Sequence, residues 1–177
     1  MFGFDEPSCR PSLLSKELSD LRKGNDLCES CTSPCALQTL TCSAIAVGFQ
    51  EDDIRHVRAL IVGPPDTPYE NGFFEFAVRF GTEYPSKPPK VDAKTTNGGR
   101  CRFNPNIYAG GKVCLSILGT WRGEKGEEWS SAQGLESVMI SIQSLMSSKP
   151  YQNEPGFENA ESPEDTKAND NYCAKVR

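Results

Sequence analysis

The chain has 177 residues, 24% of them charged, and a formal net charge of -5. This length fits one ordinary domain, and the mildly acidic balance argues against broad electrostatic binding to nucleic acid or to an anionic membrane. The sequence contains neither an apolar run of membrane-spanning length nor a basic start followed by an apolar stretch. We therefore expect a protein of the cytoplasm or the nucleus.

The first predicted helix runs from about Ser12 to Lys23. Four leucines lie along one stripe of this segment, Ser12 can cap its start and Gly24 can end it. From Asn25 to Leu40 the pattern dissolves into Cys, Ser, Thr and Pro, which predicts a loop or an irregular insertion.

The chain has eight cysteines, and four of them fall in or beside this loop, namely Cys28, Cys31, Cys35 and Cys42. Disulfides would need an extracellular context, so buried thiols, metal ligands or a nucleophile are the alternatives. Four thiolates are enough for a closed zinc site. However, the cluster lacks the paired spacing of strong zinc motifs, and Cys42 falls in a predicted strand. Loop and packing thiols are therefore the competing interpretation.

Four strands are predicted next, because the segments are rich in branched and aromatic residues or follow a proline-fixed turn: Cys42 to Phe49, His56 to Val62, Phe73 to Phe80 and Lys90 to Lys94. In the third strand Phe74, Phe76, Val78 and Phe80 alternate with other residues and should share one face. Proline-rich and glycine-rich turns at 63–72 and 84–89 separate these strands, which indicates an antiparallel meander.

Two helices are predicted after the strands. Apolar residues from Leu135 to Met146 recur at helical spacing, Ser130 with Gln133 can form a capping box, and Lys149-Pro150 should stop the helix. A last helix should begin at Ser162, with Pro163 at its first position. A helix, a meander, an irregular segment and further helices together predict an α+β domain.

These elements suggest domain boundaries. We expect an N-terminal tail at residues 1–11, a core at 12–160 with a Cys-rich insertion at 25–41, and the start of a helical extension at 161–177. Because no stop signal precedes Arg177, we expect the extension to continue in a longer protein.

The segment from Phe103 to Leu118 has no regular period, yet its apolar residues should anchor it to the domain. Cys114 lies just after Gly110-Gly111, where the chain can turn tightly. A partly exposed thiol on a fixed loop suits acyl transfer, since a thiolate attacks and a thioester keeps the acyl group activated. On the residues alone, a buried structural cysteine is the commoner explanation.

Four motifs resemble ubiquitin-conjugating enzymes, in the order of that family. They are Asn104-Pro105-Asn106 followed by Gly111-Lys112-Val113-Cys114-Leu115, the turn 63–74, the turn 84–91, and Trp129-Ser130 at the start of the long helix. The resemblance covers about residues 13 to 157. The segments 118–121 and 153–158 are most similar to the Z type of the family.

The resemblance implies the fold and the activity of that family. The fold would be an N-terminal helix, a four-stranded antiparallel meander sheet, an irregular active-site segment and C-terminal helices. Cys114 would accept ubiquitin or a ubiquitin-like modifier from an activating enzyme as a thioester and pass it to a substrate lysine or to a ligase. This acyl transfer needs no metal and no bound cofactor. The implied partners are the modifier, the activating enzyme, ligases and substrate proteins, without nucleic acid or membrane.

The resemblance also implies roles for residues around Cys114. Asn106 would stabilise the oxyanion or fasten its loop by hydrogen bonds. Asn104 replaces the family's usual histidine, which would make it a hydrogen-bonding residue of the loop. Glu154 would orient or deprotonate the incoming lysine, unless it is a solvated loop charge. Ser116 stands where some members carry Asp, but a hydroxyl is a poor base.

Other positions are less specific. His56, the only histidine, falls in a predicted strand and is most simply structural, which argues against a Cys–His hydrolase. Lys16, Arg22 and Lys23 match the region that meets the activating enzyme, although solvated charges are the plain alternative. The turns around Ser86 and Ser131-Ala132 match the ligase-facing loops, but Ser86 replaces a frequent aromatic residue.

Two other classes of function compete with a conjugating enzyme. One is an inactive family variant that only scaffolds ubiquitin, and the presence of Cys114 argues against it. The other is an interaction domain stabilised by zinc on the N-terminal cysteines.

Overall fold

The computed structural model describes residues 14–19, 38–40, 45–50, 52–123 and 125–176. Residues 14–19 are helical. The remaining elements, in chain order, are β1 (Gln38–Leu40), β2 (Ile45–Gln50), β3 (Asp53–Val62), β4 (Phe73–Arg79), β5 (Lys90–Ala93), the 3-10 turn η1 (Ser116–Leu118), α2 (Leu135–Ser144), the 3-10 turn η2 (Pro150–Asn153) and α3 (Pro163–Val176).

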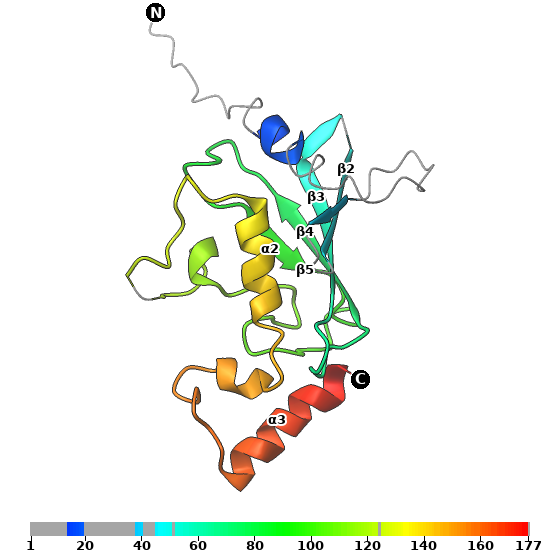
Figure 1. Cartoon of the computed structure of the whole chain (residues 1–177), viewed down its shortest axis with the longest axis vertical. Coiled ribbons are helices and arrows are strands. Elements are labelled where there is room, and N and C mark those ends of the chain that lie inside the picture. The colour runs from blue at the N-terminus through cyan, green and yellow to red at the C-terminus, as the bar shows by residue number, and fades with distance from the viewer. Residues whose placement is uncertain (1–13, 20–37, 41–44, 51, 124, 177) are drawn as a thin grey trace, which may run out of the picture.

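The strands form one antiparallel meander in the order β1-β2-β3-β4-β5 (Figure 1). The α+β class and the four predicted strands, β2 to β5, are confirmed. The loop predicted from Asn25 to Leu40 is wrong at its end, because Gln38–Leu40 pairs with β2 as a short fifth strand. Pairing at a sheet edge uses backbone groups, so this strand needs no apolar alternation in its sequence.

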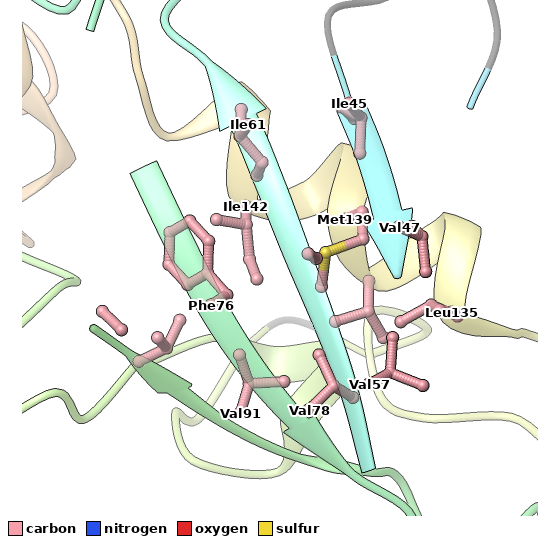
Figure 2. Packing of buried hydrophobic residues seen from close by; sticks show 14 of the residues in the cluster. Ile45, Val47, Val57, Ile61, Phe76, Val78, Val91, Leu135, Met139 and Ile142 are labelled. Carbon is pink, nitrogen blue, oxygen red and sulfur yellow. The ribbon is translucent and has the colours of Figure 1, made fainter. Parts of the chain in front are cut away.

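One face of the sheet carries the core. The three alternating positions of β4 and Phe80 just beyond it obey the predicted pattern: Phe74, Phe76, Val78 and Phe80 are all buried. Helix α2 lies across this face, and its buried side chains Leu135, Met139 and Ile142 meet those of the strands (Figure 2). The helical residues 14–19 add Leu14 and Leu18 to the same cluster.

Helix α2 begins later and ends earlier than its flanking signals predict. Ser130 and Gln133 form a turn in which Ser130 N–H donates to Gln133 Oε1 at 2.8 Å, but the helix starts only at Leu135. There the carboxylate of Glu17 accepts the N–H of Leu135 and so caps the helix from a distant segment. The helix ends at Ser144, so the predicted stop at Lys149-Pro150 is wrong.

Helix α3 starts as predicted. Ser162 and Asp165 form a reciprocal cap, in which Asp165 N–H donates to Ser162 Oγ at 3.2 Å and Ser162 N–H donates to Asp165 Oδ2 at 3.0 Å. The helix lies at the opposite end of the molecule from residues 14–19 (Figure 1). Asn169 Oδ1 accepts the N–H of Tyr151 at 3.2 Å, which fastens α3 to η2.

Some predictions fall outside the described residues. These are the tail at 1–11, the insertion at 25–41 apart from β1, and the cysteines Cys28, Cys31, Cys35 and Cys42. Over the part of the chain that the structure describes, no helix has the length and apolar character to cross a membrane.

Candidate active site

The segment before Cys114 folds back on itself as a short hairpin. Ile107 bridges to Val113, and the turn between them is closed by Tyr108 N–H donating to Lys112 O at 2.9 Å. The hairpin is joined to the sheet, because Ala93 N–H donates to Gly111 O at 2.8 Å. Ile107 and Val113 are buried, so the segment is anchored by its apolar residues as predicted.

Gly111 makes the tight turn possible. Its φ of +94° is a conformation that side-chain-bearing residues rarely adopt, and an added Cβ would lie 2.9 Å from the carbonyl oxygen of Ala93. The tight turn predicted just ahead of Cys114 is therefore placed at Gly111.

The backbone around Cys114 is held from two sides. Its N–H donates to Asn106 O at 2.8 Å. On the other side the hydroxyl of Thr120 donates to Val113 O at 2.7 Å and accepts the N–H of Leu115 at 3.0 Å, so it bridges the two neighbours of the cysteine. These bonds fix the Cα position of Cys114.

Cys114 is only 3% exposed, so the expectation of a partly exposed thiol is wrong in this structure. The neighbouring residues Val113 and Ile117 belong to the cluster of packed apolar side chains, but Cys114 does not. The thiol is therefore covered, and Cys114 counts among the buried apolar residues although it is not part of that cluster.

Asn106 lies directly beside Cys114. Its side-chain nitrogen Nδ2 donates to the carbonyl oxygen of Cys114 at 3.1 Å. One of the two amide hydrogens thus fastens the loop, as one of the two predicted roles requires, and the second amide hydrogen remains for another acceptor. Asn106 Oδ1 is buried and has no hydrogen-bond partner within the described residues.

Asn104 is fully buried and satisfies three groups. Its Nδ2 donates to Tyr69 Oη at 3.0 Å and to Leu145 O at 2.8 Å, and its Oδ1 accepts the N–H of Asn106 at 2.9 Å. The Tyr69 hydroxyl donates onward to Phe103 O at 2.9 Å, and burial raises the pKa of Tyr69 above its usual range. Asn104 is thus the hydrogen-bonding residue of the loop that its position suggested.

Glu154 is linked to the same loop by Arg102, a residue for which the sequence analysis predicted no role. The carboxylate lies 3.9 Å from Arg102 Nη2, and this nitrogen donates to the carbonyl of Pro105 at 2.6 Å. Tyr172 of α3 lies nearby: burial raises its pKa, and the Arg102 cation opposes that rise. The only sequence signal for Arg102 was a basic residue two positions before Asn104, and that position alone does not indicate a role.

The other predicted positions lie elsewhere. His56 forms an exposed pair with Asp53 of the same strand, β3, at 2.7 Å. Lys16 is exposed, whereas Arg22 and Lys23 lie outside the described residues. The segments around Ser86 and Ser131 are joined, because Trp129 Nε1–H donates to Pro85 O at 2.7 Å.

Comparison with known proteins decides the family. The family profile described as "Ubiquitin-conjugating enzyme" matches residues 30–177. The chain belongs to the ubiquitin-conjugating enzyme family. It is 55% identical over 123 residues to "Ubiquitin-conjugating enzyme E2 Z" of Homo sapiens, an alignment that covers 70% of this chain and 34% of that protein.

More distant members give the same result. The chain is 43% identical over 152 residues to "Dual E2 ubiquitin-conjugating enzyme/E3 ubiquitin-protein ligase BIRC6" of Homo sapiens, covering 84% of this chain and 3% of that protein. The solved structure of human ubiquitin-conjugating enzyme E2 G1 superposes with a TM-score of 0.58 at 31% identity, covering 81% of this chain and 98% of that one. The expected fold and the likeness to the Z type are confirmed, while the chain spans about a third of the E2 Z relative.

Proposed function

We propose that this chain is an acyltransferase that carries ubiquitin or a ubiquitin-like modifier. It accepts the modifier from an activating enzyme as a thioester on Cys114 and transfers it to a substrate lysine or to a ligase. One observation carries this assignment: in a member of this family, Cys114 and Asn106 are held against each other by two hydrogen bonds on an anchored hairpin. Such a fixed pair suits acyl transfer, since orientation removes much of the entropic cost of the reaction.

Each site residue has a role in this reaction. The Cys114 sulfur attacks the activated carboxyl of the modifier and forms the thioester. Because the thiol is covered, the sulfur has to become exposed before it reacts. The second amide hydrogen of Asn106 can then donate to the developing oxyanion. Glu154 takes a proton from the incoming lysine.

The extent and the setting of the enzyme are also part of the proposal. We assign catalysis to residues 12–160 and a helical extension to residues 161–177. Ligases and activating enzymes are the expected protein partners, and the reducing cytoplasm or nucleus keeps the nucleophilic thiol free.

The assignment is tested by incubating the protein with activating enzyme, modifier and ATP. We expect a modifier adduct that thiol reductant removes, an adduct that resists reductant with Cys114→Ser, and none with Cys114→Ala. Cys101→Ala and Cys173→Ala change the two other described thiols and serve as matched controls that should charge like the wild type. Normal charging of Cys114→Ala would refute the assignment.

The zinc alternative has its own test. Metal analysis of the purified protein decides whether the cysteines at 28, 31, 35 and 42 hold zinc, because a closed four-thiolate site retains about one metal ion per chain.

A further inference from the structure

Arg102 is fixed against the turn that carries Asn106. Its Nη2 donates to the carbonyl of Pro105 at 2.6 Å, and its guanidinium carbon lies 4.1 Å from the ring centre of Tyr108. A planar guanidinium can donate and stack at the same time, and a lysine ammonium has no such geometry. The cation therefore has a defined place beside the active-site hairpin.

The same nitrogen faces Glu154. The separation of 3.9 Å between Nη2 and Glu154 Oε2 is that of a loose ion pair, and the two side chains are 35% and 39% exposed. The backbone of Glu154 is held at the end of η2, where its N–H donates to Tyr151 O at 3.0 Å. With the backbone fixed, the cation restricts the rotamers that this carboxylate can adopt.

Arg102 also retains an unused donor. Its Nε is buried without a hydrogen-bond partner, and within the described residues the one other buried side-chain atom in that state is Asn106 Oδ1. Buried polar atoms are usually satisfied, so these two unsatisfied atoms call for an explanation, and one of them belongs to Asn106, which is hydrogen-bonded to Cys114. Both atoms belong to residues 102–106, directly before the hairpin.

We propose that Arg102 is a positioning residue, which holds the Glu154 carboxylate at the active-site turn for its reaction with the acceptor lysine. This inference rests on the function proposed above. In the step concerned, the lysine ammonium gives one proton to Glu154. The amine nitrogen then bonds to the thioester carbonyl carbon, the carbon–sulfur bond breaks, and the second proton passes to the departing Cys114 thiolate.

The test separates lysine from thiol acceptors. The protein is first charged with modifier, and discharge is then followed in a single turnover, either to free lysine over a range of concentrations or to 2-mercaptoethanol. A thiol attacks as the thiolate and needs no proton transfer to Glu154. We expect Arg102→Gln to slow discharge to lysine about threefold to fivefold, the upper size of a partly exposed ion pair, and to leave discharge to the thiol within about twofold.

Three further variants make the test specific. Arg102→Lys keeps a cation and should recover part of the lysine rate, which a purely structural role would not predict. Glu154→Gln should slow lysine discharge, and adding Arg102→Gln to it should cause no further loss, since the arginine acts through the carboxylate. Arg58→Gln breaks another arginine–glutamate pair, with Glu75 on the sheet, and should react like the wild type.

The outcomes distinguish the two proposals. Equal slowing of both acceptors by Arg102→Gln, or a further loss on the Glu154→Gln background, would overturn the positioning role. A wild-type rate of lysine discharge in Arg102→Gln would overturn it as well. If the wild-type protein did not charge on Cys114 at all, the proposed function itself would fail.

Discussion

Replacing Asn104 with alanine tests the buried polar network under the active site. The change removes the acceptor of Asn106 N–H and the donor to Tyr69 Oη and Leu145 O. A backbone donor left without a partner costs about 1–3 kcal/mol, and the lost bond to Tyr69 adds about 1 kcal/mol. We expect the free energy of unfolding to fall by about 2–4 kcal/mol, and the melting temperature by about 5–15 °C.

Asn153 provides the matched comparison. Its Nδ2 donates to the same carbonyl of Leu145 at 2.7 Å, but Asn153→Ala leaves that carbonyl with its bond from Asn104. This variant should lose about 1 kcal/mol or less. Urea unfolding followed by tryptophan fluorescence measures both losses, with the slope against urea expected to stay unchanged. Equal losses for the two variants would show that the extra bonds of Asn104 contribute nothing, and the reasoning would be refuted.

Three more predictions follow from single contacts. Gly134→Ala would place a Cβ 2.3 Å from Glu17 Oε1 and displace the cap of α2, so urea unfolding should show a loss of about 1–2 kcal/mol, and an unchanged midpoint would contradict this. Gly111→Ala, at φ +94°, should cost about 1–2 kcal/mol and slow charging of Cys114, whereas wild-type charging would argue against a role for this turn. Burial raises the pKa of Tyr69, so this residue's contribution to stability is complete below its unfolded pKa of about 10 and is lost as the pH rises above that value. Between about pH 8 and pH 11 the free energy of unfolding of the wild type should therefore fall by about 1 kcal/mol more than that of Tyr69→Phe.

Local patterns predicted the elements but not all of their ends. The alternation in β4 is a property of neighbouring residues, so the sequence alone reveals it. In α2 the helical spacing of apolar residues continues to Met146, which is 1% exposed although the helix ends at Ser144. Apolar spacing therefore reports burial, and a side chain can follow the buried stripe after the helical backbone has ended.

The site divides in the same way. The glycine turn and the motif around Cys114 are local, and both could be recognised from the sequence. The partners of Asn104 could not, because Tyr69 and Leu145 lie 35 and 41 residues away in the chain. The cap that Glu17 gives Leu135 spans 118 residues. Such pairs form only when folding brings distant segments together, and polar residues carry no periodic signal of their own.

Because Cys114 is buried, its sulfur can become exposed either by a shift of the loop backbone or by a rotation of the side chain. Exposing the sulfur by a backbone shift would break the two bonds with Asn106 and the two that Thr120 makes to its neighbours, at about 1 kcal/mol each. Rotation about the Cα–Cβ bond breaks none of them, since side chains move between staggered rotamers without a change in the backbone. Rotation is therefore the cheaper route to an exposed thiol. It leaves Asn106 in place, so under the proposed function the amide donor is already oriented when the sulfur meets the modifier.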